Sequence, residues 1–384
     1  MMADLAIVLV VLPGWIYLGA AVLAVRRFAC RARAARGATG AAGPAVTILK
    51  PLHGDEPGLS KNLRSFADQD YPMRQQIVLG VNDPRDGALT AARALVRDRP
   101  GGDIALVIDR HIDGANHKVA NLANMLRAAR HDMLVLADSD MRVERGYLTA
   151  VTAPFADPRT GLVTCLYKAA PTGGMWSQLG ALHINFGFLP GAILAETLGV
   201  GHGCFGATIV LRRQTLDRIG GFARFRDELA DDHRLGEAVR AAGLAVVLSE
   251  HIVEAQVSEP SFAALWHHEL RWARTVRGLT PLSFTGSIVT HPLALAVLAA
   301  AVTRLDPICG LALAISWLLR WAGTRVVAGA IGVEAAEPWL LPIRDILSFA
   351  VFVASFFGRK VSWRDRNFCV AADGRITADG DQVR

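Results

Sequence analysis

Cysteine is scarce in this sequence, and its spacing shows no pattern. The 384 residues contain five cysteines, without a Cys-x-x-Cys pair or any paired spacing, at positions 30, 165, 204, 309 and 369. Neither a zinc site nor a disulfide framework is therefore indicated, and reduced thiols in a cytosolic environment are the simplest interpretation.

Charged residues are also few, at 20% of the sequence, whereas 52% of the residues are hydrophobic and the mean hydropathy is +0.30. These values are high for a soluble protein, so membrane segments are expected. The net charge of +6 does not indicate a nucleic-acid partner, because much of the arginine flanks apolar segments.

The first long segment without a charge is residues 5–25. Its 21 residues are enough to cross the hydrocarbon core at about 1.5 Å per residue. Five arginines follow it between positions 26 and 36, and no acidic residue then appears before Asp55. The positive-inside rule therefore places the N-terminus outside and the following chain in the cytoplasm. A cleaved signal peptide is the alternative, but its basic region would precede the apolar segment, so a retained anchor is favoured.

From residue 45 onward, short apolar runs alternate with helical stretches. The runs predict strands at 46–49, 77–81, 104–108 and 133–137, and helices are expected at 59–67, 88–97 and 118–129. This alternation predicts a mostly parallel sheet covered by helices, whose first half resembles a nucleotide-binding half-domain. Further strands are expected near 161–167, 207–211 and 244–248, with longer intervening segments that could shape an acceptor site.

The region after this domain has a membrane character. Residues 261–277 predict a basic amphipathic helix with aromatic residues, which suits the bilayer interface; a surface helix packed on the folded domain is the alternative. Three apolar segments follow, at 288–303, 307–331 and 338–358. Because ionisable residues interrupt them, two full crossings and one partial crossing are expected. The basic tail favours a cytoplasmic C-terminus, which three full crossings after the anchor would contradict.

Acidic residues after the predicted strands carry the strongest indication of chemistry. Asp83 follows the strand at 77–81, and Asp138 and Asp140 follow the strand at 133–137. Carboxylates at such strand ends suit a divalent cation and a nucleotide diphosphate, because both bind at the carboxyl edge of an α/β sheet. Taken alone, Asp138-Ser139-Asp140 is a weak signal, since aspartate is common in turns.

Two further residues extend this pattern. Asp232 opens a helix-like run; Asp231 could simply cap that helix, or Asp232 could act as a general base toward an acceptor hydroxyl. Lys118 lies at a predicted helix start, where its charge and the free amides suit a diphosphate, although a solvated lysine is equally compatible. His183, His202 and the glycines between 199 and 206 either border a bound lipid head or form a simple turn.

Together these residues resemble a known pattern. Asp83, Asp138-Ser139-Asp140, Asp232 and His268-x-x-Arg271-Trp272 are similar to the D, D, D, (Q/R)xxRW pattern of membrane-bound inverting glycosyltransferases with a GT-A fold. The ceramide glucosyltransferase group, glycosyltransferase family 21, is most similar, including its Ser-Trp-Arg tail at Ser362-Trp363-Arg364. The sequences around Asp232 and His268 more specifically resemble the bacterial branch that glycosylates hopanoids. The resemblance covers about residues 5–375.

The resemblance implies a role for each position. Asp83 would contact the uridine of a UDP-sugar, and Asp138 and Asp140 would bind Mg²⁺ or Mn²⁺ and the diphosphate. Asp232 would be the catalytic base, with Lys118, Arg271 and Trp272 at the diphosphate or the acceptor. Two departures stand out: His268 replaces the glutamine of processive synthases, and Asp86, three residues after Asp83, could share the role of Asp83.

The resemblance also implies an organisation and a function. We expect an N-terminal anchor (1–27), a basic linker (28–44), a cytoplasmic GT-A domain ending in an interfacial helix (45–280), a C-terminal membrane region (281–358) and a cytoplasmic tail (359–384). The expected function is transfer of one hexose or N-acetylhexosamine, from UDP-glucose or UDP-N-acetylglucosamine, to a membrane lipid such as a hopanoid or a ceramide, at a bacterial inner membrane. A processive polysaccharide synthase is the first alternative. A multi-pass transporter or receptor with a cytosolic α/β module is the second.

Overall fold

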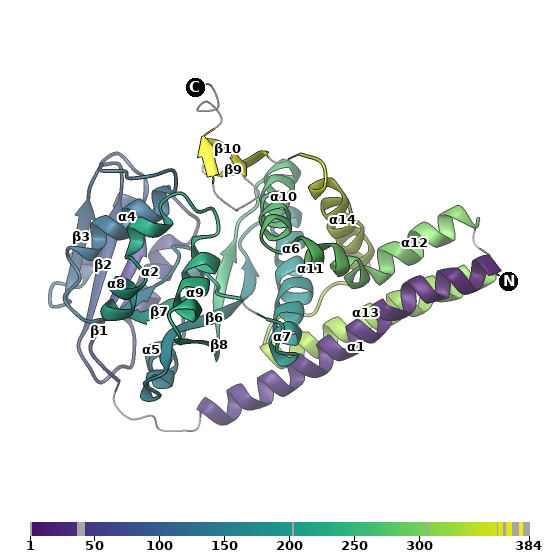
Figure 1. Cartoon of the computed structure of the whole chain (residues 1–384), viewed down its shortest axis with the longest axis horizontal. Helices are drawn as coiled ribbons and strands as arrows, with labels where there is room; N and C mark the ends of the chain where they lie inside the picture. Colours follow the sequence, from purple (N-terminus) through teal and green to yellow (C-terminus); the bar gives the residue numbers. More distant parts are fainter. Residues whose placement is uncertain are drawn as a thin grey trace.

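A mixed eight-stranded sheet forms one end of the molecule, and helices from both ends of the chain pack together at the other (Figure 1). The computed structural model describes residues 2–36, 43–201, 203–304, 306–358, 360–363, 366–370 and 376–378. His202, Arg359 and Arg364, as well as residues 37–42 of the predicted linker, lie outside these residues.

The strand order of the sheet is β3-β2-β1-β4-β7-β6-β8-β5. The bounds in chain order are β1 (Val46–Pro51), β2 (Gln75–Val81), β3 (Ile104–Ile108), β4 (Met133–Leu136), β5 (Met141–Arg142), β6 (Thr160–Pro171), β7 (Ile209–Arg212) and β8 (Ala245–Val257). Strands β3, β2, β1 and β4 run parallel, as predicted, whereas β7 is antiparallel to both of its neighbours. The second half of the sheet is therefore more mixed than the alternation pattern predicts.

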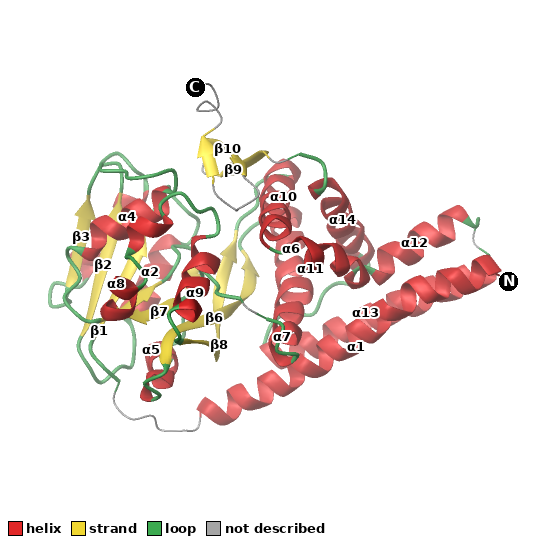
Figure 2. Cartoon of the chain, in the orientation of Figure 1, coloured by secondary structure: helices red, strands yellow, loops and turns green. Residues whose placement is uncertain are grey.

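Helices cover both faces of this sheet (Figure 2). Their bounds are α2 (Leu59–Ala67), α3 (Ala88–Asp98), α4 (His117–Leu126), α5 (Tyr147–Thr152), α8 (Arg213–Arg218) and α9 (Asp231–Ala241), with short 3₁₀ turns η1 (Ala153–Ala156) and η3 (Phe222–Phe225). The central strands are apolar on both sides, so alternate residues enter different cores. Ile48 packs in a core with Phe66 of α2, and Leu49 packs in the opposite core with Leu122 of α4.

Gly80 of β2 allows α4 to approach the sheet closely. A Cβ atom on Gly80 would lie 2.3 Å from the sulfur of Met125 and 2.4 Å from Oδ1 of Asn121. The side-chain amide of Asn121 also donates a hydrogen bond to the carbonyl of Gly80, at 2.9 Å. This close contact fixes the depth of α4, and with it the position of Lys118 at the start of the helix.

The remaining helices pack beside the sheet domain (Figure 1). Their bounds are α1 (Met2–Arg36), α6 (Met175–His183), α7 (Leu189–Thr197), α10 (Phe262–Leu279), α11 (Pro281–Gly286), α12 (Pro292–Val302), α13 (Pro307–Ile331) and α14 (Leu340–Ser355), with a π-helical turn η2 (Ile184–Phe188) and a 3₁₀ turn η4 (Ser287–Thr290). A small antiparallel sheet follows, made of β9 (Lys360–Trp363), β10 (Arg366–Val370) and β11 (Ile376–Ala378).

Helix α1 is longer than the predicted anchor. It continues through Arg36, so the first nine residues of the predicted linker are helical. Arg31, within this extension, forms a 2.7 Å ion pair with Glu250 of β8. The helix is therefore connected directly to the sheet domain.

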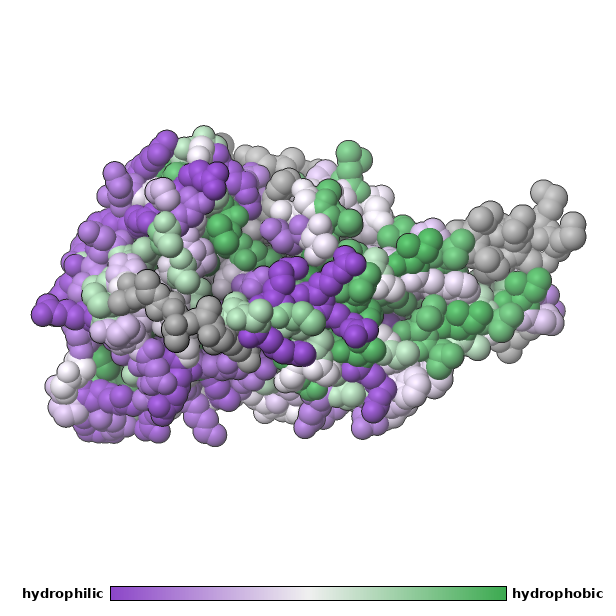
Figure 3. Space-filling model, turned by 90° about the horizontal axis from the view of Figure 1, so that it is seen from below, coloured by the Kyte–Doolittle hydropathy of each residue, from purple (hydrophilic) through white to green (hydrophobic). Residues whose placement is uncertain are grey.

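In the part of the chain that the structure describes, three helices are long and apolar enough to cross a membrane, namely Val11–Ala35, Met175–Thr197 and Pro307–Ile331. A fourth candidate is the pair Pro281–Thr290 and Pro292–Val302, which is bent by 65° at its break. Figure 3 shows hydrophobic side chains concentrated toward the end of the molecule formed by the long helices, and hydrophilic ones over the sheet domain.

Two of the predicted membrane segments need correction. The segment predicted at 288–303 belongs to the bent pair, and α14, within the segment predicted at 338–358, has only 16 residues. About 20 residues are needed to cross the hydrocarbon core, so α14 is short for a crossing. The candidate at Met175–Thr197 was missed, because this stretch lies between two strands of the sheet and was interpreted as part of the acceptor side.

Replacing Gly80 with alanine tests the close approach of α4. The added methyl group would overlap Met125 and Asn121, so we expect Gly80→Ala to lower the free energy of unfolding by about 1–3 kcal/mol. Thermal unfolding of the purified protein in detergent measures this. Gly101→Ala is the matched control, because no atom lies within 4 Å of its Cβ position. Equal unfolding temperatures for the two variants would contradict the close contact.

Candidate active site

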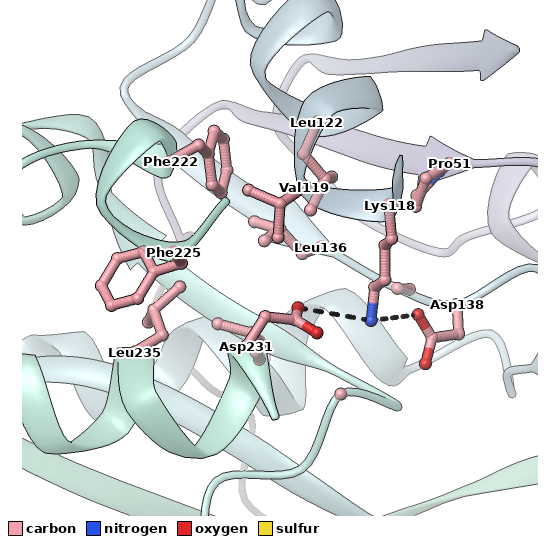
Figure 4. A pocket seen from close by; sticks show the side chains of 13 residues that line it. Pro51, Lys118, Val119, Leu122, Leu136, Asp138, Phe222, Phe225, Asp231 and Leu235 are labelled. Atoms are coloured by element: carbon pink, nitrogen blue, oxygen red, sulfur yellow. Dashed lines mark ion pairs between the residues drawn. The ribbon is translucent and has the colours of Figure 1, made fainter. Parts of the chain in front are cut away.

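Lys118 lies at the centre of an acidic cluster (Figure 4). Its Nζ is 2.7 Å from Oδ1 of Asp138 and 3.7 Å from Oδ2 of Asp231. Burial alone would lower the pKa of Lys118, but Asp138, Asp231 and Asp232 together raise it above its usual value. The lysine is therefore a permanent cation held among carboxylates, and the alternative of a solvated lysine is wrong.

Asn116 holds the first turn of α4 in place. Its Oδ1 accepts hydrogen bonds from the amides of Lys118 and Val119, which makes it the N-cap of the helix. Its side-chain amide donates to the carbonyl of Glu228 at 2.8 Å and to Asp231 at 3.4 Å. One buried asparagine thus connects the start of α4 with the start of α9.

The Asp138-Ser139-Asp140 turn follows β4, and two side chains bind its backbone. Lys50, which is fully buried at the end of β1, donates a hydrogen bond to the carbonyl of Asp138 and packs over the ring of Phe66. Asn62 donates to the carbonyl of Ser139 at 3.3 Å. The backbone of the turn is therefore fixed by two buried side chains.

Of the two carboxylates in this turn, Asp140 has the less favourable environment for a negative charge. Within the described part of the chain its buried Oδ1 has no hydrogen-bond partner. Burial, followed by the neighbouring charges of Asp138 and Glu56, raises the pKa of Asp140 to about 7. Lys50 opposes this rise, and burial lowers the pKa of Lys50 itself to about 8. The site therefore favours an additional positive charge near Asp140.

Helix α9 brings Asp231 and Asp232 to the same edge. Ala230 is the N-cap and neither aspartate makes a side-chain cap, so the interpretation of Asp231 as a simple cap is wrong. Burial raises the pKa of both aspartates, to about 6 for Asp231, and Lys118 opposes the rise. Asp232 accepts hydrogen bonds from the amides of Gly206 and His233, each at 2.8 Å.

Gly206 faces the centre of the cluster. A Cβ atom there would lie 3.2 Å from both Nζ of Lys118 and Oδ2 of Asp232, and 3.3 Å from Oδ2 of Asp138. Three charged groups predicted from separate parts of the sequence therefore surround one point. Among the glycines between 199 and 206, Gly206 is the one that leaves this point open.

Asp83 lies at the same sheet edge but outside the cluster. It is half-exposed, and hydrogen bonds from the backbone and side chain of Arg85 lower its pKa. Asp86 instead is 7% exposed and accepts hydrogen bonds from the amides of Gly54 and Ala88. Asp86 therefore connects two loops, and only Asp83 presents a carboxylate at the surface.

The predicted helix at 261–277 is α10, with Ser261 as its N-cap. Trp272 packs edge-to-face against His268 and, like Tyr167 and Phe188, packs against a small buried cluster that includes Val257. Burial, followed by Asp140, Asp232 and Asp138, raises the pKa of the Tyr167 hydroxyl, whereas Arg271 lowers it. Tyr167 therefore lies near both the acidic cluster and Arg271, which brings the Arg-Trp motif to the border of the site.

Several residues of this site are not among those predicted from the sequence. Lys50, Asn116 and Tyr167 were not considered, and Gly206 was not distinguished from its neighbours. Lys50 had a recognisable signal, because it is the one charged residue in the apolar strand Val46–Pro51. Tyr167 had none, since an aromatic residue in a strand usually indicates a core position.

A pocket opens beside the cluster. Lys118, Asp138 and Asp231 line one side of it, and apolar side chains line the other, including Leu122, Phe222 and Phe225 (Figure 4). Within the described residues, no group of three or more His, Cys, Asp or Glu side chains converges on one metal position. Any cation held by Asp138 and Asp140 would therefore complete its shell with oxygens of a bound ligand or water.

The mixed sheet with an acidic turn at the end of β4 is the architecture of a GT-A glycosyltransferase, as predicted. The model for Glycosyl transferase family 21 matches residues 6–376, and the chain belongs to this family. The predicted family is thereby confirmed.

Several known proteins are similar to the chain. Ceramide glucosyltransferase 1 of Caenorhabditis elegans is 22% identical over 240 residues, covering 62% of this chain and 51% of the relative. The chain thus spans about half the length of that relative. Ceramide glucosyltransferase of Komagataella phaffii is 36% identical over 108 residues, covering 27% of this chain and 21% of the relative. A mannosyltransferase from Pyrobaculum calidifontis, solved with GDP-Man and Mn²⁺, has 17% identity and a TM-score of 0.48, covering 91% of this chain and 99% of that one.

Replacing Gly206 with alanine tests the open point in the cluster. We expect Gly206→Ala to lower catalytic turnover by about tenfold or more, because its methyl group would displace the charged groups around the reacting atoms. The unfolding temperature should stay close to that of the wild type. Gly146→Ala, with no atom within 4 Å of its Cβ position, is the control. Wild-type turnover in Gly206→Ala would exclude this point from the reaction.

Proposed function

We propose that this protein transfers a single hexose or N-acetylhexosamine from a UDP-sugar to the hydroxyl group of a membrane lipid, with inversion at the anomeric carbon. The observation that carries the proposal is the convergence of Lys118, Asp138 and Asp232 around Gly206. Membership in family 21 supports a glycosyl transfer. Helices apolar enough to cross a membrane support a lipid acceptor.

Asp138 and Asp140 fit a divalent cation. The buried Oδ1 of Asp140 lacks a partner within the described residues, and carboxylate oxygens are the ligands that Mg²⁺ and Mn²⁺ prefer. When bound, such a cation supplies positive charge to the diphosphate. Lys50 fixes the turn that carries both carboxylates, so the two oxygens are held in place before any ligand binds.

Lys118 and Arg271 would stabilise the departing diphosphate. Lys118 is a permanent cation at the N-terminus of α4, where the helix dipole also favours an anion. Arg271 lies near Tyr167, on which the carboxylates of the acidic cluster also act. Negative charge that develops on the leaving group would thus lie near two cations, while the half-exposed Asp83 would contact the uridine.

Asp232 would accept the proton of the lipid hydroxyl. Two backbone amides hold its carboxylate, and burial raises its pKa from the ordinary value. A raised pKa makes a carboxylate a stronger base at neutral pH. The activated hydroxyl would attack the anomeric carbon opposite the diphosphate in one displacement, which accounts for inversion.

The acceptor would reach the site from the bilayer. Phe262, Trp176 and Trp266 form an aromatic group at the start of α10, and Phe262 is 46% exposed. Aromatic side chains with an apolar body and a polar edge suit the membrane interface. We infer that the chain is an integral protein of a bacterial inner membrane with its site on the cytoplasmic face, and that the acceptor is a hopanoid or a ceramide-type lipid.

Mass spectrometry of lipid products tests the function. Membranes containing the protein are incubated with UDP-glucose or with UDP-N-acetylglucosamine, and lipids are extracted. We expect one product, heavier than its acceptor lipid by a single sugar, that is absent with Asp232→Asn. A series of products with increasing numbers of sugars would favour a processive synthase, and no sugar-containing product with any added lipid would contradict the proposal.

Removal of metal should abolish the activity. Because Asp138 and Asp140 offer hard oxygen ligands, we expect turnover to vanish in EDTA and to return on addition of Mg²⁺ or Mn²⁺. Asp140→Asn should lose most of the activity while keeping the wild-type unfolding temperature, since the change is nearly isosteric. Full turnover in chelator would exclude the metal.

Variants of two neighbouring aspartates distinguish the catalytic base from the carboxylate that pairs with Lys118. We expect Asp232→Asn to lower kcat by roughly 10²-fold or more while UDP binding is retained. Asp231→Asn should mainly weaken UDP-sugar binding, because Asp231 contacts Lys118 and Asn116. Steady-state kinetics and UDP binding are measured for both variants. If Asp231→Asn loses kcat and Asp232→Asn does not, Asp231 is the base.

A reporter fusion tests the orientation. By the positive-inside rule, the arginines at the end of α1 support a cytoplasmic location for the chain that follows. Alkaline phosphatase, which is active only in the periplasm, should therefore be silent when fused after Ala45. A fluorescent protein that folds in the cytoplasm, fused at the same position, is the control. An active phosphatase fusion would reverse the orientation.

A further inference from the structure

Arg344 and Glu269 form a buried ion pair between two helices. Both guanidinium Nη atoms of Arg344, on α14, contact the carboxylate oxygens of Glu269, on α10, at 2.7 Å each. The two side chains are only 1% and 5% exposed. Such a two-point contact fixes both the distance and the rotation of one helix relative to the other.

The same guanidinium reaches a third helix. Nη1 of Arg344 also donates a hydrogen bond to the carbonyl of Leu179, on α6, at 3.1 Å. One side chain of the C-terminal region therefore holds α10, α14 and α6 together. Charged residues in such apolar regions are costly, so a buried arginine here indicates a specific use.

Glu269 belongs to the motif that borders the active site. It follows His268 and lies two positions before Arg271 and three before Trp272. His268 is held from the other side, because its Nδ1 lies 2.6 Å from the carboxylate of Glu259. Both residues at the start of the motif are thus fixed, one to the loop before α10 and the other to α14.

A second buried pair in the same region lacks this connection. Arg320 of α13 contacts Asp345 of α14 at 3.0 Å, and the two side chains are 12% and 9% exposed. Arg320 also donates to the carbonyl of Phe186. Pro190, four residues later, has no amide hydrogen to offer that carbonyl. This pair joins α13, α14 and η2 and makes no contact with α10 that the structure records.

We propose that Arg344 is a positioning residue, which acts through Glu269 to hold Arg271 and Trp272 at the diphosphate site. The inference rests on the proposed function of Arg271. Arg320 and Arg344 each donate a hydrogen bond to a backbone carbonyl of the helical stretch Met175–Thr197. Of the two, only Arg344 pairs with a carboxylate of the motif that contains Arg271 and Trp272. The C-terminal helical region is thereby part of the machinery that orients the donor.

Binding of UDP in the presence of Mn²⁺, measured by calorimetry on the full-length protein in detergent, tests the proposal. The double variant Glu269→Gln/Arg344→Met removes the pair without leaving a buried charge unpaired. We expect it to weaken UDP binding by about tenfold. The matched control Arg320→Met/Asp345→Asn should retain wild-type affinity, because the hydrogen bonds recorded for this pair among the described residues do not involve α10.

A double-mutant cycle shows whether Arg344 acts through Arg271. If it does, Arg344→Met should weaken UDP binding in the wild type and have no further effect in an Arg271→Met background. Arg344→Lys, which keeps the charge but loses the two-point contact, should fall between Arg344→Met and the wild type.

Three results would overturn the proposal. They are wild-type UDP affinity in the double variant, an equal loss of affinity in the control pair, and full additivity of Arg344→Met and Arg271→Met. Unfolding temperatures of all variants are measured alongside, and affinities are expressed per folded molecule. Failure of the wild type to bind UDP is a different outcome, since it would remove the proposed function together with the inference that rests on it.

Discussion

The site depends on one charge balance, in which Lys118 is surrounded by the carboxylates of Asp138, Asp231 and Asp232. Each group alone would be unfavourable in such a buried position, because desolvation penalises its charged form. Together they hold the ends of β4, α4 and α9 at one point. The close approach at Gly80 and the cap at Asn116 both serve this geometry, since they set where Lys118 lies.

A second buried lysine, Lys50, supports the turn that carries Asp138 and Asp140. Lys50 has no exposure and donates a hydrogen bond to the carbonyl of Asp138, whereas Lys118 pairs with its carboxylate. Asp138 is therefore held through its carbonyl by one lysine and through its carboxylate by another. Asp140 is therefore the carboxylate of the site whose charge is least compensated. This is a physical reason to expect a bound cation beside Asp140, and not beside Asp231, which is already paired with Lys118.

Much of the first half of the fold could be predicted from the sequence, because each strand between residues 46 and 137 is a short apolar run bounded by polar loops. The second half was harder, since β6 and β8 are long strands of 12 and 13 residues that carry polar positions. The aspartates and the Arg-Trp motif were recognised from residue type and order. Gly206 and Tyr167 were not, because their importance comes from what they face in three dimensions.

The interpretation of Asp231 as a helix cap is wrong for the same reason, because its role depends on what it faces in three dimensions. Sequence alone shows two adjacent aspartates at a helix start, where one as a cap and one as a functional group is the simplest division. The structure instead gives the cap position to Ala230 and directs Asp231 toward Lys118, so that both carboxylates face the cluster. Helix boundaries that shift by one residue change such an assignment completely.

The unbroken course of α1 has a mechanical consequence. Within the described residues, a helix continues from the apolar segment through Arg36 and is paired to β8 through Arg31 and Glu250, which joins this helix directly to the domain. The domain and this helix would then tilt together. The distance of the domain from the bilayer would depend on the number of helical residues outside the membrane, at about 1.5 Å per residue. The thickness of the surrounding membrane would thereby influence how deeply the site sits among the lipid head groups.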